Sequence, residues 1–178
     1  MKTINVGVIG TGWCGGIRAN TCASSALVGE LHIAEVNAER LREVQKETNP
    51  TFATSDYHDL ISNDGIDAII VSTTPETTHY PITRESLLAG KHVLLEKPLS
   101  LTLDEADELI KLARDRDLKF TVGYSQRFNP KFAYIKKSLE EGTIGTPVSA
   151  LISRHISRKL GDKIGGRIKL SPAAMEAT

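Results

Sequence analysis

The stretch that decides the fold is VGVIGTGWCGGIRAN, residues 6–20. Four glycines, Gly10, Gly12, Gly15 and Gly16, lie within seven residues directly after an apolar run. Because glycine weakens both strands and helices, a cluster here indicates that something must approach the backbone closely. The alternative is an ordinary glycine-rich turn, and the surrounding sequence has to decide between the two.

Strand and helix patterns alternate at short spacing along the first 123 residues. Short β-branched or apolar runs predict strands, and capped or amphipathic stretches between them predict helices. The expected strands are 4–9, 31–36, 67–72, 91–95 and 118–122, and the expected helices are 17–24, 37–48, 55–61, 75–90 and 102–117. Since no hairpin signal interrupts this alternation, we expect an α/β fold with a doubly wound parallel sheet covered on both faces.

The rhythm changes near Gly123, where we place a domain boundary. Residues 130–140 are predicted to be helical, 142–147 to form a turn and 148–156 to form a strand. A loop rich in Lys, Arg and Gly then leads into the start of another helix. The sequence therefore predicts one domain over 1–123 and the beginning of an α+β second domain, incomplete here, over 124–178.

Composition narrows the classes of function. The 178-residue chain carries 22 Lys and Arg against 22 Asp and Glu, which leaves no basic excess for nucleic acid or an anionic membrane. No apolar run approaches the ~20 residues of a membrane span. Cys14 and Cys22 fit neither a metal spacing nor a disulfide framework. We expect a cytoplasmic protein with no metal site, no nucleic-acid partner and no membrane partner.

Three of the opening glycines fit the pattern G-x-G-x-x-G, which binds dinucleotides when it follows a strand and opens a helix. Gly10 then makes the tight turn, Gly12 lets the backbone approach the pyrophosphate, and Gly15 lets helix and strand pack closely. The helix N-terminus offers free N–H groups to the phosphates. We therefore predict a Rossmann-type fold whose opening loop binds the cofactor through Gly10, Thr11, Gly12, Trp13, Cys14 and Gly15.

Two residues near this loop carry alternatives. Glu35 lies twenty residues after Gly15, where a carboxylate hydrogen-bonds the ribose hydroxyls of NAD and repels the 2′-phosphate of NADP; a solvated acid at a strand end is the alternative. Arg40 is the only close cation for such a phosphate, so we predict NAD over NADP. Cys14 is predicted to be a small loop filler, with a thiol activated by the helix N-terminus as the alternative.

Four further stretches carry a family resemblance: VSTTPETTHY (71–80), AGKHVLLEKPLS (89–100), TVGYSQRFNP (121–130) and GTIGTP (142–147). Together with the opening loop they resemble the Gfo/Idh/MocA oxidoreductases, named for glucose–fructose oxidoreductase and inositol dehydrogenase. The combination of AGKHVLLEKP with a preceding T-P-x-x-x-H segment is the specific part. The resemblance implies hydride transfer between a nicotinamide cofactor and a sugar, polyol or related hydroxy compound, in a homo-oligomer.

The resemblance also implies roles for residues after the third and fourth predicted strands. Thr73, Thr74 and Pro75 would line the cofactor crevice, and His79 either contacts the cofactor or packs on its neighbours. Glu96 and Lys97 would both lie at the cofactor. Lys97 would also face the substrate hydroxyl and assist proton transfer as the catalytic residue.

The crossing into the second domain carries two further candidates. By resemblance, Tyr124 and Arg127 border the nicotinamide and the substrate. An arginine there can bind a carboxylate or phosphate bidentately, or it can brace the two domains against each other.

The chain departs from the family in its length. By resemblance, residues 1–123 are the NAD(P)-binding domain and residues 124–178 begin the substrate and oligomerisation domain. Family members run longer and carry an Asp and a His on a helix of that second domain. Glu176 lies close to the expected acid, but none of the five histidines matches that position. We expect the N-terminal part of a longer protein, and we predict that the 178-residue chain binds NAD without efficient turnover. The alternatives are a non-catalytic NAD-binding module or sensor, and NAD-assisted glycoside cleavage.

Overall fold

The computed structural model describes residues 3–153 and 155 of the chain. They form two compact units, which divide between Gly123 and Tyr124. The elements of the first unit are β1 (Ile4–Ile9), α1 (Trp13–Ala23), β2 (Val28–Ala34), α2 (Ala38–Thr48), β3 (Phe52–Thr54), α3 (His58–Ile61), β4 (Ala68–Val71), a 3₁₀ turn (Glu76–Thr78), α4 (His79–Leu88), β5 (His92–Leu95), α5 (Leu103–Asp115) and β6 (Phe120–Val122).

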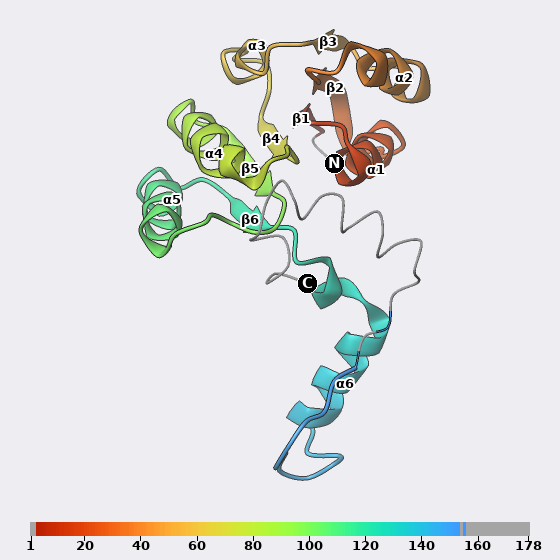
Figure 1. Cartoon of the computed structure of the whole chain (residues 1–178), viewed down its shortest axis with the longest axis vertical. Coiled ribbons are helices and arrows are strands. Elements are labelled where there is room, and N and C mark those ends of the chain that lie inside the picture. Colours follow the sequence, from red (N-terminus) through yellow and green to blue (C-terminus); the bar gives the residue numbers. More distant parts are fainter. Residues whose placement is uncertain (1–2, 154, 156–178) are drawn as a thin grey trace. The chain divides into compact units, whose positions relative to one another are not determined.

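The first unit is built on a parallel sheet with the strand order β3-β2-β1-β4-β5-β6. This order confirms the expected Rossmann-type, doubly wound fold. Val8 lies at the middle of the sheet, where it pairs with Ile33 of β2 on one side and Ile70 of β4 on the other. Figure 1 shows α1 and α2 beside β1 to β3, and α4 and α5 beside β4 to β6.

Alternate residues of the central strands fill two separate cores. Val8 and Ile33 pack with Val44 of α2, whereas Ile9 packs into a larger cluster that includes Leu87 of α4. Successive strand residues point to opposite faces of a sheet, so both faces of the central strands are covered. This explains why the strands are continuous apolar runs rather than alternating ones.

Two elements at the site begin earlier than the sequence predicts. Helix α1 begins at Trp13 instead of Ile17, and β2 spans Val28–Ala34 instead of 31–36. The low helix propensity of Gly15 and Gly16 argues for the later start, but both glycines are buried, and their packing outweighs propensity. Glu35 therefore follows the end of β2 rather than standing inside it.

Strand β3 is absent from the prediction, and one predicted helix is divided. Phe52–Thr54 pairs with His32–Ala34 at the sheet edge, and three residues are too few to show a strand period. The predicted helix 75–90 consists of a 3₁₀ turn followed by α4, which begins at His79. The predicted strands 67–72, 91–95 and 118–122 are present as β4, β5 and β6, each one or two residues shorter at its ends.

The second unit contains a 3₁₀ turn (Ser125–Phe128) and the predicted helix α6 (Pro130–Glu140), which Asn129 caps through Lys131 N. The predicted strand 148–156 is wrong for its described residues, 148–153 and 155, which form no strand. A strand needs a neighbour to pair its backbone groups, and the described residues supply none there. The predicted loop and helix beyond Arg158, with Glu176, lie outside the described residues.

None of the helices within the described residues is long and apolar enough to cross a membrane. The assignment of residues 124–178 to a substrate and oligomerisation domain stays a prediction.

Thr102 and Glu105 cap the N-terminus of α5 through hydrogen bonds. The Thr102 hydroxyl accepts a hydrogen bond from Glu105 N, and Leu101 N donates to the Glu105 carboxylate. We expect Thr102→Ala to lower the free energy of unfolding by about 1 kcal/mol, because a helix N–H loses its acceptor. Urea unfolding followed by circular dichroism measures this. Thr102→Ser keeps the hydroxyl and is the control; an equal loss in both variants contradicts the capping role.

Candidate cofactor-binding site

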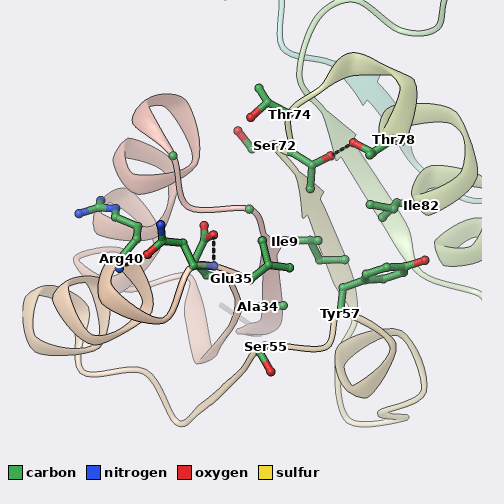
Figure 2. A pocket seen from close by; sticks show the side chains of 15 residues that line it. Ile9, Ala34, Glu35, Arg40, Ser55, Tyr57, Ser72, Thr74, Thr78 and Ile82 are labelled. Atoms are coloured by element: carbon green, nitrogen blue, oxygen red, sulfur yellow. Dashed lines mark hydrogen bonds between the residues drawn. The ribbon is translucent and has the colours of Figure 1, made fainter. Parts of the chain in front are cut away.

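A cleft of about 460 Å³ lies at the carboxyl ends of the strands, where β1 and β4 are neighbours. The chain leaves β1 toward β2 and leaves β4 toward β5, so the strand order reverses here, which is the usual ligand position in open α/β sheets. Figure 2 shows Glu35 and Arg40 on one side of the cleft and Thr74 and Thr78 on the other. The lining residues are Ile9, Gly10, Gly12, Ala34, Glu35, Val36, Asn37, Arg40, Ser55, Tyr57, Ser72, Thr73, Thr74, Thr78 and Ile82.

The glycine loop is as tight as the motif requires. Gly10 has φ +81°, and a Cβ there would lie 2.8 Å from the Ser72 carbonyl oxygen. A Cβ at Gly15 would overlap the Gly10 carbonyl oxygen. By contrast, a Cβ at Gly12 would have nothing within 4 Å, so the space above Gly12 is open. Two glycines thus serve packing, and Gly12 serves the cleft.

The N-terminus of helix α1 lies at the cleft, and its first turn carries no anionic side chain. Gly12 is its N-cap, no side chain caps it, and its first turn holds no acidic residue. The first N–H groups of a helix lack intrahelical partners and attract anions. Trp13 and Cys14 are exposed on this first turn. The N-terminus of α1 can therefore bind phosphate.

Glu35 is fixed between the glycine loop and α2. One carboxylate oxygen accepts hydrogen bonds from Thr11 N at 2.7 Å and Thr11 Oγ1 at 2.9 Å, and the other accepts from Asn37 N at 2.9 Å. A carboxylate has about four acceptor positions, so it can still accept from a ligand hydroxyl. Thr11 itself is fully buried, so its role is to orient Glu35.

Arg40 lies beside Glu35, but its charge is already engaged. Its Nε donates to the Thr11 carbonyl at 2.8 Å, and its Nη1 lies 2.9 Å from Glu43 and 3.7 Å from Glu47. The carboxylates around it offset the positive charge that a 2′-phosphate would need.

The segment after β4 forms the opposite wall. Thr73 and Thr74 line the cleft, and the Thr73 hydroxyl lies 2.6 Å from that of Thr78. Pro75 is exposed, and the Thr78 hydroxyl donates to its carbonyl oxygen. His79 is buried, with both ring nitrogens close to backbone carbonyl oxygens, so the geometry favours the alternative of a packed histidine over cofactor contact.

The segment after β5 carries the candidate catalytic lysine. Glu96 accepts hydrogen bonds from Arg18 Nε at 3.0 Å and Nη2 at 2.6 Å, an ion pair that joins α1 to the end of β5. Lys97 is half-buried, and among residues 3–153 and 155 its ammonium has no hydrogen-bond or ion-pair partner. Glu96 and Lys97 are therefore not a charge pair, and neither is among the residues that line the cleft.

Tyr124 and Arg127 belong to the second unit, where Arg127 N donates to the Tyr124 carbonyl at 3.0 Å. Their substrate-binding roles stay predictions. In the described part of the chain, no group of three His, Cys, Asp or Glu side chains could bind a metal ion.

Comparison with known proteins identifies the family of this chain. Residues 4–124 match the family model described as the oxidoreductase family with an NAD-binding Rossmann fold, Gfo/Idh/MocA. The chain is a Gfo/Idh/MocA family member. The match covers more than half of the chain and includes the glycine loop, Glu35 and Lys97.

Relatives of this Gfo/Idh/MocA chain include inositol dehydrogenases. It is 34% identical over 144 residues to myo-inositol 2-dehydrogenase of Thermotoga maritima, and 29% identical over 144 residues to scyllo-inositol 2-dehydrogenase (NADP(+)) of Bacillus subtilis. A Lactobacillus casei scyllo-inositol dehydrogenase structure with NAD(H) and scyllo-inositol has a TM-score of 0.75 at 29% identity. These matches cover 81% of this chain but only 39–43% of each relative.

The cleft of this family member includes residues that sequence reasoning missed as lining. Ser55 and Tyr57 follow β3, and Val36 follows Glu35 at the end of β2. Burial raises the pKa of the Tyr57 phenol above its ordinary value, and the nearby Glu85 carboxylate raises it further. Recognising β3 would have placed Ser55 and Tyr57 at the ligand edge of the sheet.

The different surroundings of Gly12 and Gly15 predict opposite effects of a methyl group. Gly12→Ala should change the free energy of unfolding by no more than about 1 kcal/mol, because the methyl enters open space at a helix cap. It should weaken NADH binding at least ~10-fold, because the pyrophosphate needs that space. Gly15→Ala should cost about 3 kcal/mol or more through overpacking. Urea unfolding and NADH titration of both variants measure this; equal destabilisation contradicts the assignment.

Proposed function

We propose that this chain is the NAD-binding part of a dehydrogenase that acts on a sugar, a polyol or a related hydroxy compound. The observation that carries the proposal is the open helix N-terminus at Gly12, which faces a cleft at the strand reversal with Glu35 beside it. The pyrophosphate of NAD would bind the first turn of α1, and the adenosine ribose would bind Glu35. The inositol dehydrogenases among its relatives support the substrate class.

NAD is proposed over NADP on electrostatic grounds. A ribose hydroxyl can donate to the Glu35 carboxylate, whereas a 2′-phosphate would be repelled by it. Arg40 is engaged by Thr11, Glu43 and Glu47, so it offers a phosphate little net positive charge.

Lys97 is proposed as the group that moves the proton. The bound nicotinamide supplies hydride chemistry, and the chain supplies orientation and charge. The ammonium of Lys97 would donate a proton to the substrate oxygen when the carbonyl is reduced, and the resulting amine would take the hydroxyl proton when the alcohol is oxidised. The chain spans about two-fifths of the length of the relatives that it matches.

Two further proposals concern the cellular location and the assembly of the protein. Cys14 and Cys22 are both free thiols, which fits a reducing, cytoplasmic location. We also propose that the protein assembles as a homo-oligomer, as the family resemblance implies.

A fluorescence titration tests the proposed cofactor. Trp13 is the only tryptophan and stands on the first turn of α1, so bound NADH should quench its emission. We expect saturable quenching by NADH and at least ~10-fold weaker binding of NADPH, a difference of about 1.4 kcal/mol. Binding of neither nucleotide would contradict the proposed function, and an equal or reversed preference would contradict the role of Glu35.

Removing the charge of Glu35 tests the cofactor preference separately. Glu35→Gln keeps an oxygen that accepts from Thr11 but removes the charge that repels a 2′-phosphate. We expect the ratio of the NADPH to the NADH dissociation constant to fall ~10-fold, about 1.4 kcal/mol. Glu39→Gln, on the first turn of α2 outside the cleft lining, is the control. An unchanged ratio in Glu35→Gln would show that the carboxylate does not select the cofactor.

A further inference from the structure

His79 stands at the first position of α4, with its side chain only 1% exposed. Its Nδ1 lies 2.7 Å from the carbonyl oxygen of Pro98, and its Nε2 lies 3.1 Å from that of Thr73. Both ring nitrogens are thus directed at backbone carbonyl oxygens. No ring atom is left to bind a ligand.

These two carbonyls belong to segments that follow neighbouring strands. Thr73 follows β4 and lines the cleft, whereas Pro98 follows β5 and comes directly after Lys97. The two strands are neighbours in the sheet, but beyond their ends the sheet no longer holds the two segments together. The imidazole ring therefore connects the wall of the cleft to the backbone that carries the candidate proton donor.

The His79 ring is suited to hold these two backbone segments at a fixed distance from each other. An imidazole presents two polar atoms on opposite sides of a rigid plane, so contacts to both carbonyls set the distance between the segments. A flexible amide can reach one carbonyl, and an apolar side chain can reach neither.

We propose that His79 is a positioning residue for the nicotinamide half of the site: it holds the segment 73–75 against the segment 96–98 and so places Lys97. This inference rests on the proposed function. The glycine loop and Glu35 lie on the other side of the strand reversal, and among the described residues no hydrogen bond joins them to His79. The role of His79 is therefore confined to one end of the dinucleotide.

Two ligands separate this role from a general structural one. NADH spans both halves of the site, whereas ADP lacks the nicotinamide and its ribose and uses only the adenosine half. Calorimetric titration of the 178-residue chain should show that His79→Leu weakens NADH binding ~10-fold, as expected for the loss of a buried hydrogen bond, and ADP binding less than twofold. His79→Gln, which keeps one contact, should fall between His79→Leu and the unsubstituted protein. His58→Gln, at an exposed histidine, is the matched control.

A measurement on the unsubstituted protein covers the case in which a variant fails to fold. With ¹⁵N-labelled histidine, NADH should shift the ring resonances of His79, and ADP should leave them unchanged. Three results would overturn the positioning role: equally weakened binding of NADH and ADP in the variants, unchanged binding of both, or His79 ring resonances that do not shift when NADH binds. If the unsubstituted chain binds neither ligand, the proposed function fails, and this inference fails with it.

Discussion

The rest of the site depends on one close approach, that of helix α1 to strand β1 at the glycine loop. A side chain at Gly15 would overlap the Gly10 carbonyl oxygen, and a side chain at Gly10 would meet the backbone at Ser72. Because this contact leaves no room for a Cβ, the N-terminus of α1 is held directly over the ends of β1 and β4. Packing alone therefore places the dipole of α1 and its first N–H groups at the cleft, with no charged side chain needed.

The same approach fixes the orientation of the charged side chains beside the loop. Thr11, between two glycines, is buried and gives both its N–H and its hydroxyl to Glu35, while its carbonyl accepts from Arg40. Thr11 therefore orients both the Glu35 carboxylate and the Arg40 guanidinium. The arginine pairs with Glu43 and Glu47 rather than with Glu35, and the Glu35 carboxylate lines the cleft.

Much of this was predictable from the sequence, and the misses have physical causes. Some signals depend on local chemistry and can be read from the sequence: the apolar runs predicted the sheet, and the G-x-G-x-x-G spacing and the acid at Glu35 predicted one wall of the cleft. Strand β3 is too short for a periodic signal, so Ser55 and Tyr57 were not placed at the ligand edge. The early start of α1 depends on the burial of Gly15 and Gly16, and the partner of Glu96 is Arg18, 78 residues away; tertiary packing sets both. The strand expected over 148–156 has no pairing neighbour among the described residues, a condition that an apolar pattern cannot reveal.

The glycine loop and the segment after β5 are held by different means, and this affects how each can change. Backbone packing shapes the glycine loop, so a substitution at Gly10 or Gly15 acts on the fold, whereas one at Gly12 acts on the open space of the cleft. Side chains that cross between elements hold the segment after β5: Arg18 of α1 fixes Glu96, and His79 of α4 contacts Pro98. The residues on either side of Lys97 are therefore both held by helices. Because Arg18 takes up the charge of Glu96, this carboxylate does not pair with the neighbouring Lys97 ammonium, which has no partner among the described residues.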